Sequence, residues 1–286
     1  MRAQALSRPL LRYLGGKFRL AQRIIGHFPP HDTYVEPFGG AASLLLLKPP
    51  VDRETYNDLD GELVNLFRVL RSPAAGRLIR LLELTPYARA EYLAAFEPSD
   101  DPVEQARRTI VRSHMAHGNM SLRRTRPSGL RVDGLSGNTN VAANWADFPG
   151  ALRVIVDRLR RVSIEQMDGR TLIAAFDGPR VLVYVDPPYV RKTRLSAQVA
   201  ADSAPLYTHE MSDADHEELV EQLVASKAMV LVSGYPSDLY NKRLQDWRRV
   251  EIEARAHRNS PRTEALWINQ LAQAALDAGP LFREVA

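Results

Sequence analysis

Four consecutive residues, Asp186, Pro187, Pro188 and Tyr189, combine groups that can hold and expose an aromatic amine. The Asp186 carboxylate can accept a hydrogen bond from an exocyclic amine, and the Pro187 carbonyl can accept a second one. The Tyr189 ring can stack on a planar base. An amine held between two acceptors keeps its lone pair exposed to an electrophile. The motif therefore favours transfer of a group to that nitrogen.

The residues before this motif are expected to place it at the end of a strand. The run from Val181 to Val183 is apolar and free of charge, which is typical of a buried parallel strand. Pro187 and Pro188 lack backbone donors and fix their own φ, so the strand cannot continue through them. Open α/β sheets bind ligands at the carboxyl ends of their strands. The alternative interpretation of this motif is a turn that ends the strand, followed by a tyrosine on the surface, without a functional role.

A strand, a glycine turn and a helix are predicted in succession between Tyr34 and Leu47. The turn, Glu36-Pro37-Phe38-Gly39-Gly40, has neither the Gly-x-Gly-x-x-Gly pattern nor a phosphate-loop lysine, so NAD and ATP are poor candidates. With an acidic residue in the loop, a cationic ligand fits better. Asp58 and Asp60 lie about 20 residues further on, where a ribose diol is usually held. Their alternative role is to cap the helix predicted to follow.

Two further charged residues belong to the same arrangement. Lys17 follows a Gly-Gly loop and opens a predicted helix, where it can meet a carboxylate, although most such triplets are simple loops. Asp168 closes a strand predicted from Val162, at the place where an adenine amine would sit if the sheet carries a nucleoside. The alternative for Asp168 is a turn residue ahead of Gly169.

A basic stretch lies between these two groups of motifs. Seven arginines and no acidic residue occur between Gln105 and Arg131, and a segment rich in turn-forming residues follows. Such a stretch fits a DNA-reading insertion, with Arg123, Arg124, Arg126 and Arg131 as candidate DNA contacts. The alternative is a solvated helical face with a loop.

The composition narrows the classes of protein and of chemistry. Hydrophobic and charged residues make up 45% and 25% of the 286 residues, which is ordinary for a soluble globular protein. No apolar run is long enough to span a membrane and no signal peptide is recognisable, so we expect a cytoplasmic location. Cysteine is absent, which excludes disulfides and cysteine nucleophiles. The seven histidines form no ligand pattern, and no metal site is predicted.

Taken together, the motifs resemble the Dam-like N6-adenine DNA methyltransferases. The matching stretches are Tyr13-Leu-Gly-Gly-Lys17, Val35-Glu-Pro-Phe-Gly-Gly40, Asn57-Asp-Leu-Asp60 and Asp186-Pro-Pro-Tyr189, with weaker matches at Asp213-Ala-Asp-His216 and Glu264-Ala-Leu-Trp-Ile-Asn269. They occur in the family's own order. A departure from the family pattern is Ala42, where glycine is common.

The resemblance implies a fold and a set of site residues. The fold is an α/β Rossmann-like methyltransferase sheet with an inserted, mainly helical target-recognition domain. Residues 1–72 and 150–286 would form the catalytic domain and residues 73–149 the insertion. The implied cofactor is S-adenosyl-L-methionine, whose sulfonium is a cation. Its implied contacts are Tyr13, Lys17, Glu36, Pro37, Phe38, Gly39, Gly40, Asp58, Asp168 and Asp186.

The resemblance also implies the reaction. An adenine of double-stranded DNA would flip out of the helix, because its amine cannot be reached inside the stack. Asp186 and the Pro187 carbonyl would hold that amine, Tyr189 would stack on the ring, and Asp186, Pro187, Pro188 and Tyr189 form the catalytic motif. Methyl transfer would be direct and in line. We expect a monomer that needs no metal and no membrane.

Several alternatives remain at this stage. Cytosine carbon-5 methylation is excluded because it needs a cysteine nucleophile. Methylation of cytosine amines usually uses a motif that begins with serine, and glutamine methylation uses asparagine there, so Asp186 favours adenine by resemblance. Adenine methylation of RNA and a DNA-binding module with an inactive methyltransferase core stay open.

Overall fold

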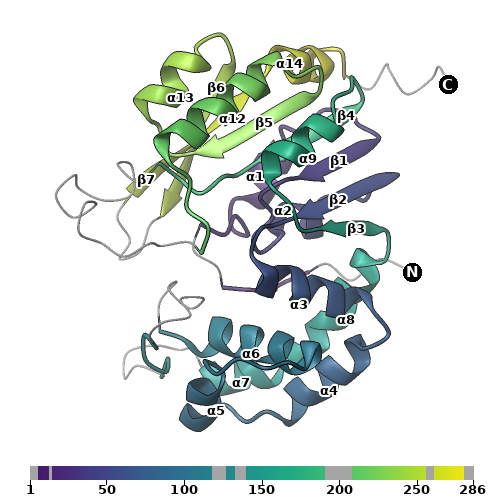
Figure 1. Ribbon diagram of the computed structural model, residues 1–286, viewed down its shortest axis with the longest axis vertical. Helices are drawn as coiled ribbons and strands as arrows, with labels where there is room; N and C mark the ends of the chain where they lie inside the picture. The colour runs from purple at the N-terminus through teal and green to yellow at the C-terminus, as the bar shows by residue number, and fades with distance from the viewer. Residues whose placement is uncertain are drawn as a thin grey trace. The chain divides into compact units, whose positions relative to one another are not determined.

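Seven strands form one sheet in the order β3-β2-β1-β4-β5-β7-β6 in the computed structural model (Figure 1). β4 pairs in parallel with β1 and β5, β1 pairs in parallel with β2, and β7 is antiparallel to both β5 and β6. The strands are β1 Thr33–Glu36, β2 Arg53–Asn57, β3 Val162–Glu165, β4 Val181–Val185, β5 Met229–Gly234, β6 Arg248–Arg255 and β7 Pro261–Ile268. The predicted α/β class is therefore confirmed.

The structure describes residues 6–12, 15–117, 127–132, 140–190, 208–255 and 261–279, and it divides into two compact units. The sheet unit comprises residues 19–39, 48–59 and 165–286, and the helical unit comprises residues 1–18, 40–47 and 60–164. β3 begins in the helical unit and ends at Glu165 of the sheet unit. The assignment of residues 73–149 to a recognition insertion stays a prediction.

The helices are distributed over both units. The sheet unit contains α1 Ala21–Ile25, α9 Gly169–Ala175, α12 Asp213–Ala225, α13 Asp238–Arg243 and α14 Gln270–Asp277. The helical unit contains α2 Ser43–Leu47, α3 Gly61–Arg71, α4 Ala75–Leu84, α5 Arg89–Ala94, α6 Pro102–Met115, α7 Val141–Ala146 and α8 Phe148–Leu159.

β4, which leads into the Asp-Pro-Pro-Tyr motif, is a central strand. Its residues from Leu182 to Val185 are buried, and it is hydrogen-bonded to β1 on one edge and β5 on the other. Pairing on both edges satisfies its backbone groups, and an apolar sequence suits burial on both faces. The prediction of a buried parallel strand ahead of Asp186 is confirmed.

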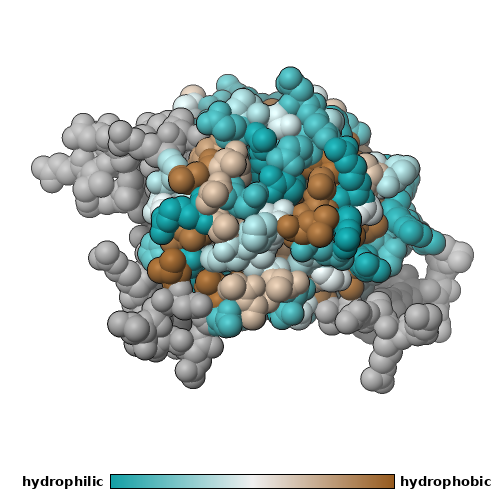
Figure 2. Space-filling model, turned by 90° about the horizontal axis from the view of Figure 1, so that it is seen from below, coloured by the Kyte–Doolittle hydropathy of each residue, from teal (hydrophilic) through white to brown (hydrophobic). Residues whose placement is uncertain are grey.

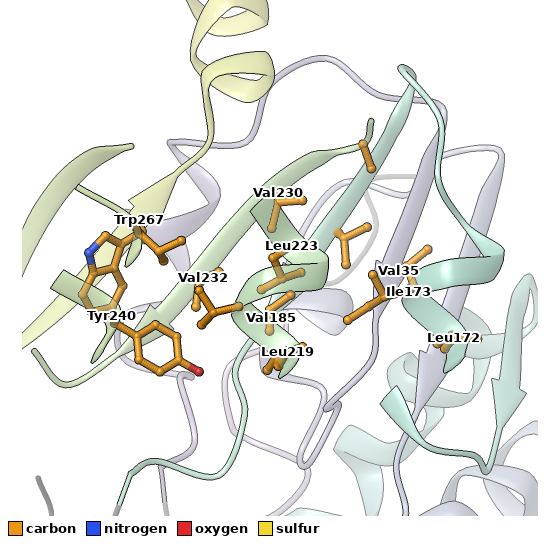
Figure 3. Packing of buried hydrophobic residues seen from close by; sticks show 14 of the residues in the cluster. Val35, Leu172, Ile173, Val185, Leu219, Leu223, Val230, Val232, Tyr240 and Trp267 are labelled. Atoms are coloured by element: carbon orange, nitrogen blue, oxygen red, sulfur yellow. The ribbon is translucent and has the colours of Figure 1, made fainter. Parts of the chain in front are cut away.

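The core of the sheet unit lies between the strands and the helices α9 and α12. Valines of β1, β4 and β5 pack against leucine and isoleucine side chains of these helices, and the labelled ones are Val35, Val185, Val230, Val232, Leu172, Ile173, Leu219 and Leu223 (Figure 3). The rings of Tyr240 and Trp267 are 5.6 Å apart and extend the same cluster. Burying each large apolar side chain contributes about 1.5–3 kcal/mol, which fixes both helices on the sheet.

Helix beginnings follow the capping residues that the sequence offers. Asp60 accepts a hydrogen bond from the Glu62 amide at 2.9 Å and caps α3, so its alternative role is confirmed. Ser212 and Asp215 form a capping box at the start of α12. These side chains satisfy amide groups that have no partner inside the helix.

The N-terminal segment is attached to α6 within the helical unit. The Ser113 hydroxyl accepts from the Arg12 amide at 2.7 Å, and His114 Nε2 lies 2.9 Å from the Leu10 carbonyl. The His114 ring also packs on Phe148, with ring centroids 4.0 Å apart. These contacts fix the chain directly before the motif that contains Lys17.

On the face shown in Figure 2, apolar areas are separated by hydrophilic atoms. Large exposed apolar side chains, such as Leu84 of α4 and Val224 of α12, come from different elements, and scattered side chains of this kind are usual. Among the described helices, none has the length and apolar character to cross a membrane.

We expect His114 to make the stability of the folded protein depend on pH in the acid range. Burial lowers the pKa of His114 from 6.5 to about 4, helped by the nearby charge of Arg8 and opposed by the hydrogen bond to Leu10. The folded state therefore keeps His114 neutral while the unfolded chain takes up a proton below pH 6.5, so stability falls as the pH drops from 6.5 towards 4. We expect His114→Phe to flatten this dependence by at most about 3 kcal/mol in urea unfolding.

Exposed His117 provides the matched control. An equally steep acid destabilisation in His114→Phe would contradict the assignment to His114.

Candidate active site

Asp186 is held at the end of β4 by a chain of hydroxyl groups. Ser233, at the end of β5, has its Oγ 2.9 Å from Asp186 Oδ1 and 2.6 Å from the Tyr184 hydroxyl. Because an ionised carboxylate only accepts, Ser233 donates to Asp186 and in turn accepts from Tyr184. Burial, and then the charge of Asp186, raises the pKa of Tyr184 well above its ordinary value. Tyr184 thus stays a donor, and the orientation of the Asp186 carboxylate is fixed.

Tyr189 is fixed at both its hydroxyl and its ring. The hydroxyl donates to Glu264 of β7, and the ring meets Tyr235 edge to face with centroids 4.7 Å apart. Only 7% of Tyr189 is exposed. Burial raises its pKa well above the ordinary value, and the carboxylates of Asp186 and Glu264 raise it further. The phenol therefore stays neutral at any pH at which the protein would work.

The loop after β1 approaches β2 too closely for any residue but glycine. The Gly39 amide donates to the Asn57 carbonyl at 2.8 Å. A Cβ at Gly39 would lie 2.2 Å from Tyr56 Cε2 and 3.0 Å from the Asn57 carbonyl oxygen. The preceding Glu36 is buried, with 2% exposed. This is the close backbone approach that the glycine turn predicts.

Asn57 joins three strand ends. Its Nδ2 donates to the Pro37 carbonyl at 2.8 Å and to the Met167 carbonyl at 3.0 Å, while its Oδ1 accepts from the Met167 amide at 2.9 Å. The loops after β1, β2 and β3 are thus held by one amide side chain, which is fully buried. The Phe38 ring lies directly against Gly169: a Cβ on Gly169 would lie only 2.8 Å from the Cζ atom of Phe38.

Asp168 does not end a strand, since β3 stops at Glu165. Asp168 instead caps α9 by accepting from the Arg170 amide at 2.8 Å, which is the turn role named as its alternative. The Arg170 guanidinium also binds it, and this contact lowers the pKa of the Asp168 carboxyl. A ligand amine at this carboxylate must therefore share it with Arg170. Asp58, directly after β2, is partly buried.

Further predicted cofactor contacts belong to the helical unit. Lys17 is 4% exposed and its Nζ donates to the Gly15 carbonyl at 3.0 Å. Gly40 has a φ of 50° and Ala42 a φ of 51°, in the left-handed region that favours glycine. The departure from the family pattern at Ala42 therefore coincides with a strained backbone. Tyr13 lies outside the described residues.

Several arginines of the basic stretch between Gln105 and Arg131 form ion pairs with nearby carboxylates, so part of the positive charge of this stretch is neutralised. Arg107 and Arg108 bind Glu104, and Arg112 binds Glu62, so these arginines stabilise the helices of their own unit. Arg131 is anchored through its backbone: its amide donates to the Met115 carbonyl at 2.7 Å, and its own carbonyl accepts from Tyr87. Arg123, Arg124 and Arg126 lie outside the described residues.

The sheet unit therefore gathers acidic and aromatic groups at the carboxyl ends of its strands. Glu36, Asp186 and Glu264 all lie close enough to Tyr184 to raise its pKa. Three carboxylates around one strand end favour a cationic ligand over a phosphate. In the part of the chain that the structure describes, no three His, Asp or Glu side chains are grouped to hold a metal ion.

Sequence reasoning did not assign roles to Ser233, Asn57 or Glu264. Asn57 and Glu264 stand inside motifs that carried the family resemblance, so their place in the motif was a usable signal. Ser233 directly follows the apolar run from Ala228 to Val232, and a small polar residue at the end of such a run was its signal.

A glycine turn, carboxylates and an aromatic ring lie at the carboxyl ends of the parallel strands of this mixed sheet, which is an arrangement typical of nucleotide-binding α/β enzymes. The model of the D12 class N6 adenine-specific DNA methyltransferase family matches residues 13–257. The chain belongs to this family and is a DNA adenine methyltransferase.

Individual relatives agree with this result. The chain is 27% identical to a DNA adenine methylase of Serratia marcescens over 259 residues, which are 84% of this chain and 87% of the relative. It is 28% identical to a DNA adenine methylase of Salmonella typhi over 243 residues, 82% of each protein. A DNA adenine methylase of Haemophilus influenzae is 36% identical over 70 residues, 24% of each.

Substituting Gly39 tests the close approach of the loop to β2. Gly39→Ala forces a methyl group onto the Tyr56 ring, and such overpacking typically costs about 1–3 kcal/mol of unfolding free energy. Gly76→Ala in α4 is the matched control, because a Cβ there meets nothing within 4 Å. Urea unfolding should show a loss for Gly39→Ala and none for Gly76→Ala. Equal stability of the two variants would show that the loop is not packed as described.

Proposed function

We propose that this enzyme transfers the methyl group of S-adenosylmethionine to N6 of an adenine flipped out of double-stranded DNA. The observation that carries the proposal is the Asp186 carboxylate, placed at the end of the central strand and oriented by Ser233. An oriented acceptor can hold an adenine amine in one direction, with its lone pair presented for in-line attack.

The residues present fit the proposed cofactor. S-adenosylmethionine supplies an electrophilic methyl group on a sulfonium, which is a cation. Glu36 and Asp186 provide negative charge at the edge of the sheet, and Asp58 follows β2, where a ribose diol is usually held. At the tight turn formed by Pro37, Phe38 and Gly39, the backbone can come close to the bound cofactor. The roles of Asp168, Gly40, Lys17 and Tyr13 are carried over from the family resemblance.

The chain's own groups would do little covalent chemistry. Asp186 and the Pro187 carbonyl accept hydrogen bonds from the adenine amine, Pro188 keeps the backbone turned away from the strand, and Tyr189 stacks on the adenine ring. Two acceptors on one amine increase the electron density at nitrogen and stabilise the positive charge that develops there. The family supports DNA over RNA as the substrate, and we propose Arg123, Arg124, Arg126 and Arg131 as DNA contacts in a recognition insertion at residues 73–149.

Sequencing of plasmid DNA for methylated bases tests the proposal. Plasmid is isolated from cells that express the parent protein or Asp186→Ala, and single-molecule sequencing maps N6-methyladenine. We expect one recurrent sequence to carry the modification with the parent protein, and a loss of at least about 100-fold with Asp186→Ala, since it removes an acceptor from the reacting amine.

Glu165→Ala is the control for Asp186→Ala, because it also removes an acidic side chain but at a residue that is assigned no role. The Glu165→Ala variant should methylate the same DNA sequence as the parent protein. If soluble parent protein binds S-adenosylmethionine but leaves DNA unmodified, the DNA proposal fails and RNA is the substrate to test. If it binds no S-adenosylmethionine, the inactive-module alternative is favoured.

A further inference from the structure

Glu264 carries a carboxylate at a buried position, where a charged group costs free energy. It lies on β7 opposite Ile252 of β6, and only 4% of it is exposed. The next residue, Ala265, pairs with Gly234 at the end of β5. A buried carboxylate loses its hydration, and this cost is offset only by hydrogen bonds and charges around it. Glu264 therefore needs an explanation beyond filling space.

Glu264 is hydrogen-bonded to the tyrosine of the Asp-Pro-Pro-Tyr motif. The Tyr189 hydroxyl donates to Glu264 Oε1, across 75 residues of sequence. A hydrogen bond to a charged acceptor is stronger and more directional than one between neutral groups. β7 thus fixes the far end of the Tyr189 ring.

A tyrosine ring has two side-chain torsions, and the surrounding structure restricts both. Pro187 and Pro188 restrict the backbone that leads to Tyr189. Tyr235 meets the ring edge to face, at an interplanar angle of 67°. With the hydroxyl bound to Glu264, the plane of the ring is defined.

Stability alone does not account for this arrangement. Replacing a buried ionic or polar pair by apolar residues of similar volume is often neutral or stabilising. A leucine opposite a phenylalanine would pack the same space without burying a charge. The pair of Tyr189 and Glu264 is therefore better explained by what it does to the position of the ring.

We propose that Glu264 is a positioning residue for methyl transfer: it holds the Tyr189 hydroxyl so that the ring offers the flipped adenine one fixed stacking surface. The proposal rests on the proposed function of Tyr189. Glu264 acts through Tyr189 and does not touch the base. A ring displaced by about 1 Å misaligns the amine at Asp186, and misplacement of this size can cost roughly 100-fold in rate.

Four variants separate positioning from structure: Glu264→Leu, Glu264→Gln, Tyr189→Phe and the double variant Tyr189→Phe/Glu264→Leu. Single-turnover methylation of a duplex with the recognition sequence gives the rate, and urea unfolding gives stability. We expect Glu264→Leu and Tyr189→Phe to slow methylation by about 10- to 100-fold, with a much smaller change in cofactor affinity. Glu264→Gln keeps an acceptor for the hydroxyl and should recover most of the lost rate.

The double variant is decisive. It replaces the pair by apolar side chains, so stability should return towards that of the parent protein. Its rate should stay as low as that of Tyr189→Phe, and the two single effects should not multiply, because each removes the same hydrogen bond.

A duplex with 2-aminopurine at the target position gives a readout that needs no methyl transfer. Its fluorescence rises when the base leaves the stack and is quenched on an aromatic surface, so Glu264→Leu and Tyr189→Phe should give the same altered intensity. Recovery of both rate and stability in the double variant would overturn the proposal, as would a Glu264→Leu variant that is folded and as fast as the parent. A parent protein that leaves DNA unmodified would instead contradict the proposed function.

Discussion

The structure of the sheet unit depends on hydrogen bonds that cross from one strand end to the next. Polar side chains at the carboxyl edge of a sheet must be satisfied where the ladder of backbone hydrogen bonds stops. Asn57 does this for the loops after β1 and β3, and Ser233 does it for Asp186 and Tyr184. These side chains keep the loops in fixed positions relative to one another. The proposed chemistry needs that rigidity, because its groups act by position.

The same edge concentrates negative charge. Burial raises the pKa of Tyr184 and of Tyr189, Asp186 and Glu264 raise both further, and Glu36 adds to the effect on Tyr184. Both phenols are thereby kept as donors to the groups around them. In the helical unit, by contrast, opposite charges are paired: Arg107, Arg108 and Arg112 bind carboxylates of their own unit. Counting arginines along a sequence therefore overstates the charge available to DNA.

Local sequence was sufficient for the parts of the fold that depend on near neighbours. The apolar run before Asp186 predicted β4, the glycine turn predicted the loop after β1, and Asp60 and Ser212 capped the helices that follow them. It was insufficient where partners are distant in sequence. Neither the bond from Ser233 to Asp186 nor that from Tyr189 to Glu264 has a local signature. β6 was not predicted, although its residues from Val250 to Ala254 alternate between apolar and charged as in a half-buried strand, and Asp168 was placed at a strand end although β3 stops three residues earlier.

The carboxylates at the edge of the sheet are proposed to form the site of a cationic nucleoside cofactor. Calorimetric titration of S-adenosylmethionine into the parent protein, Glu36→Gln and Asp168→Asn tests this directly. We expect one saturable site, with affinity reduced at least about 10-fold in Glu36→Gln, because the substitution removes a buried negative charge from the proposed site of the cation. Asp168→Asn should lose less, since Arg170 already neutralises that carboxylate. Parent affinity in a folded Glu36→Gln variant, or no binding to the parent protein, would contradict the account.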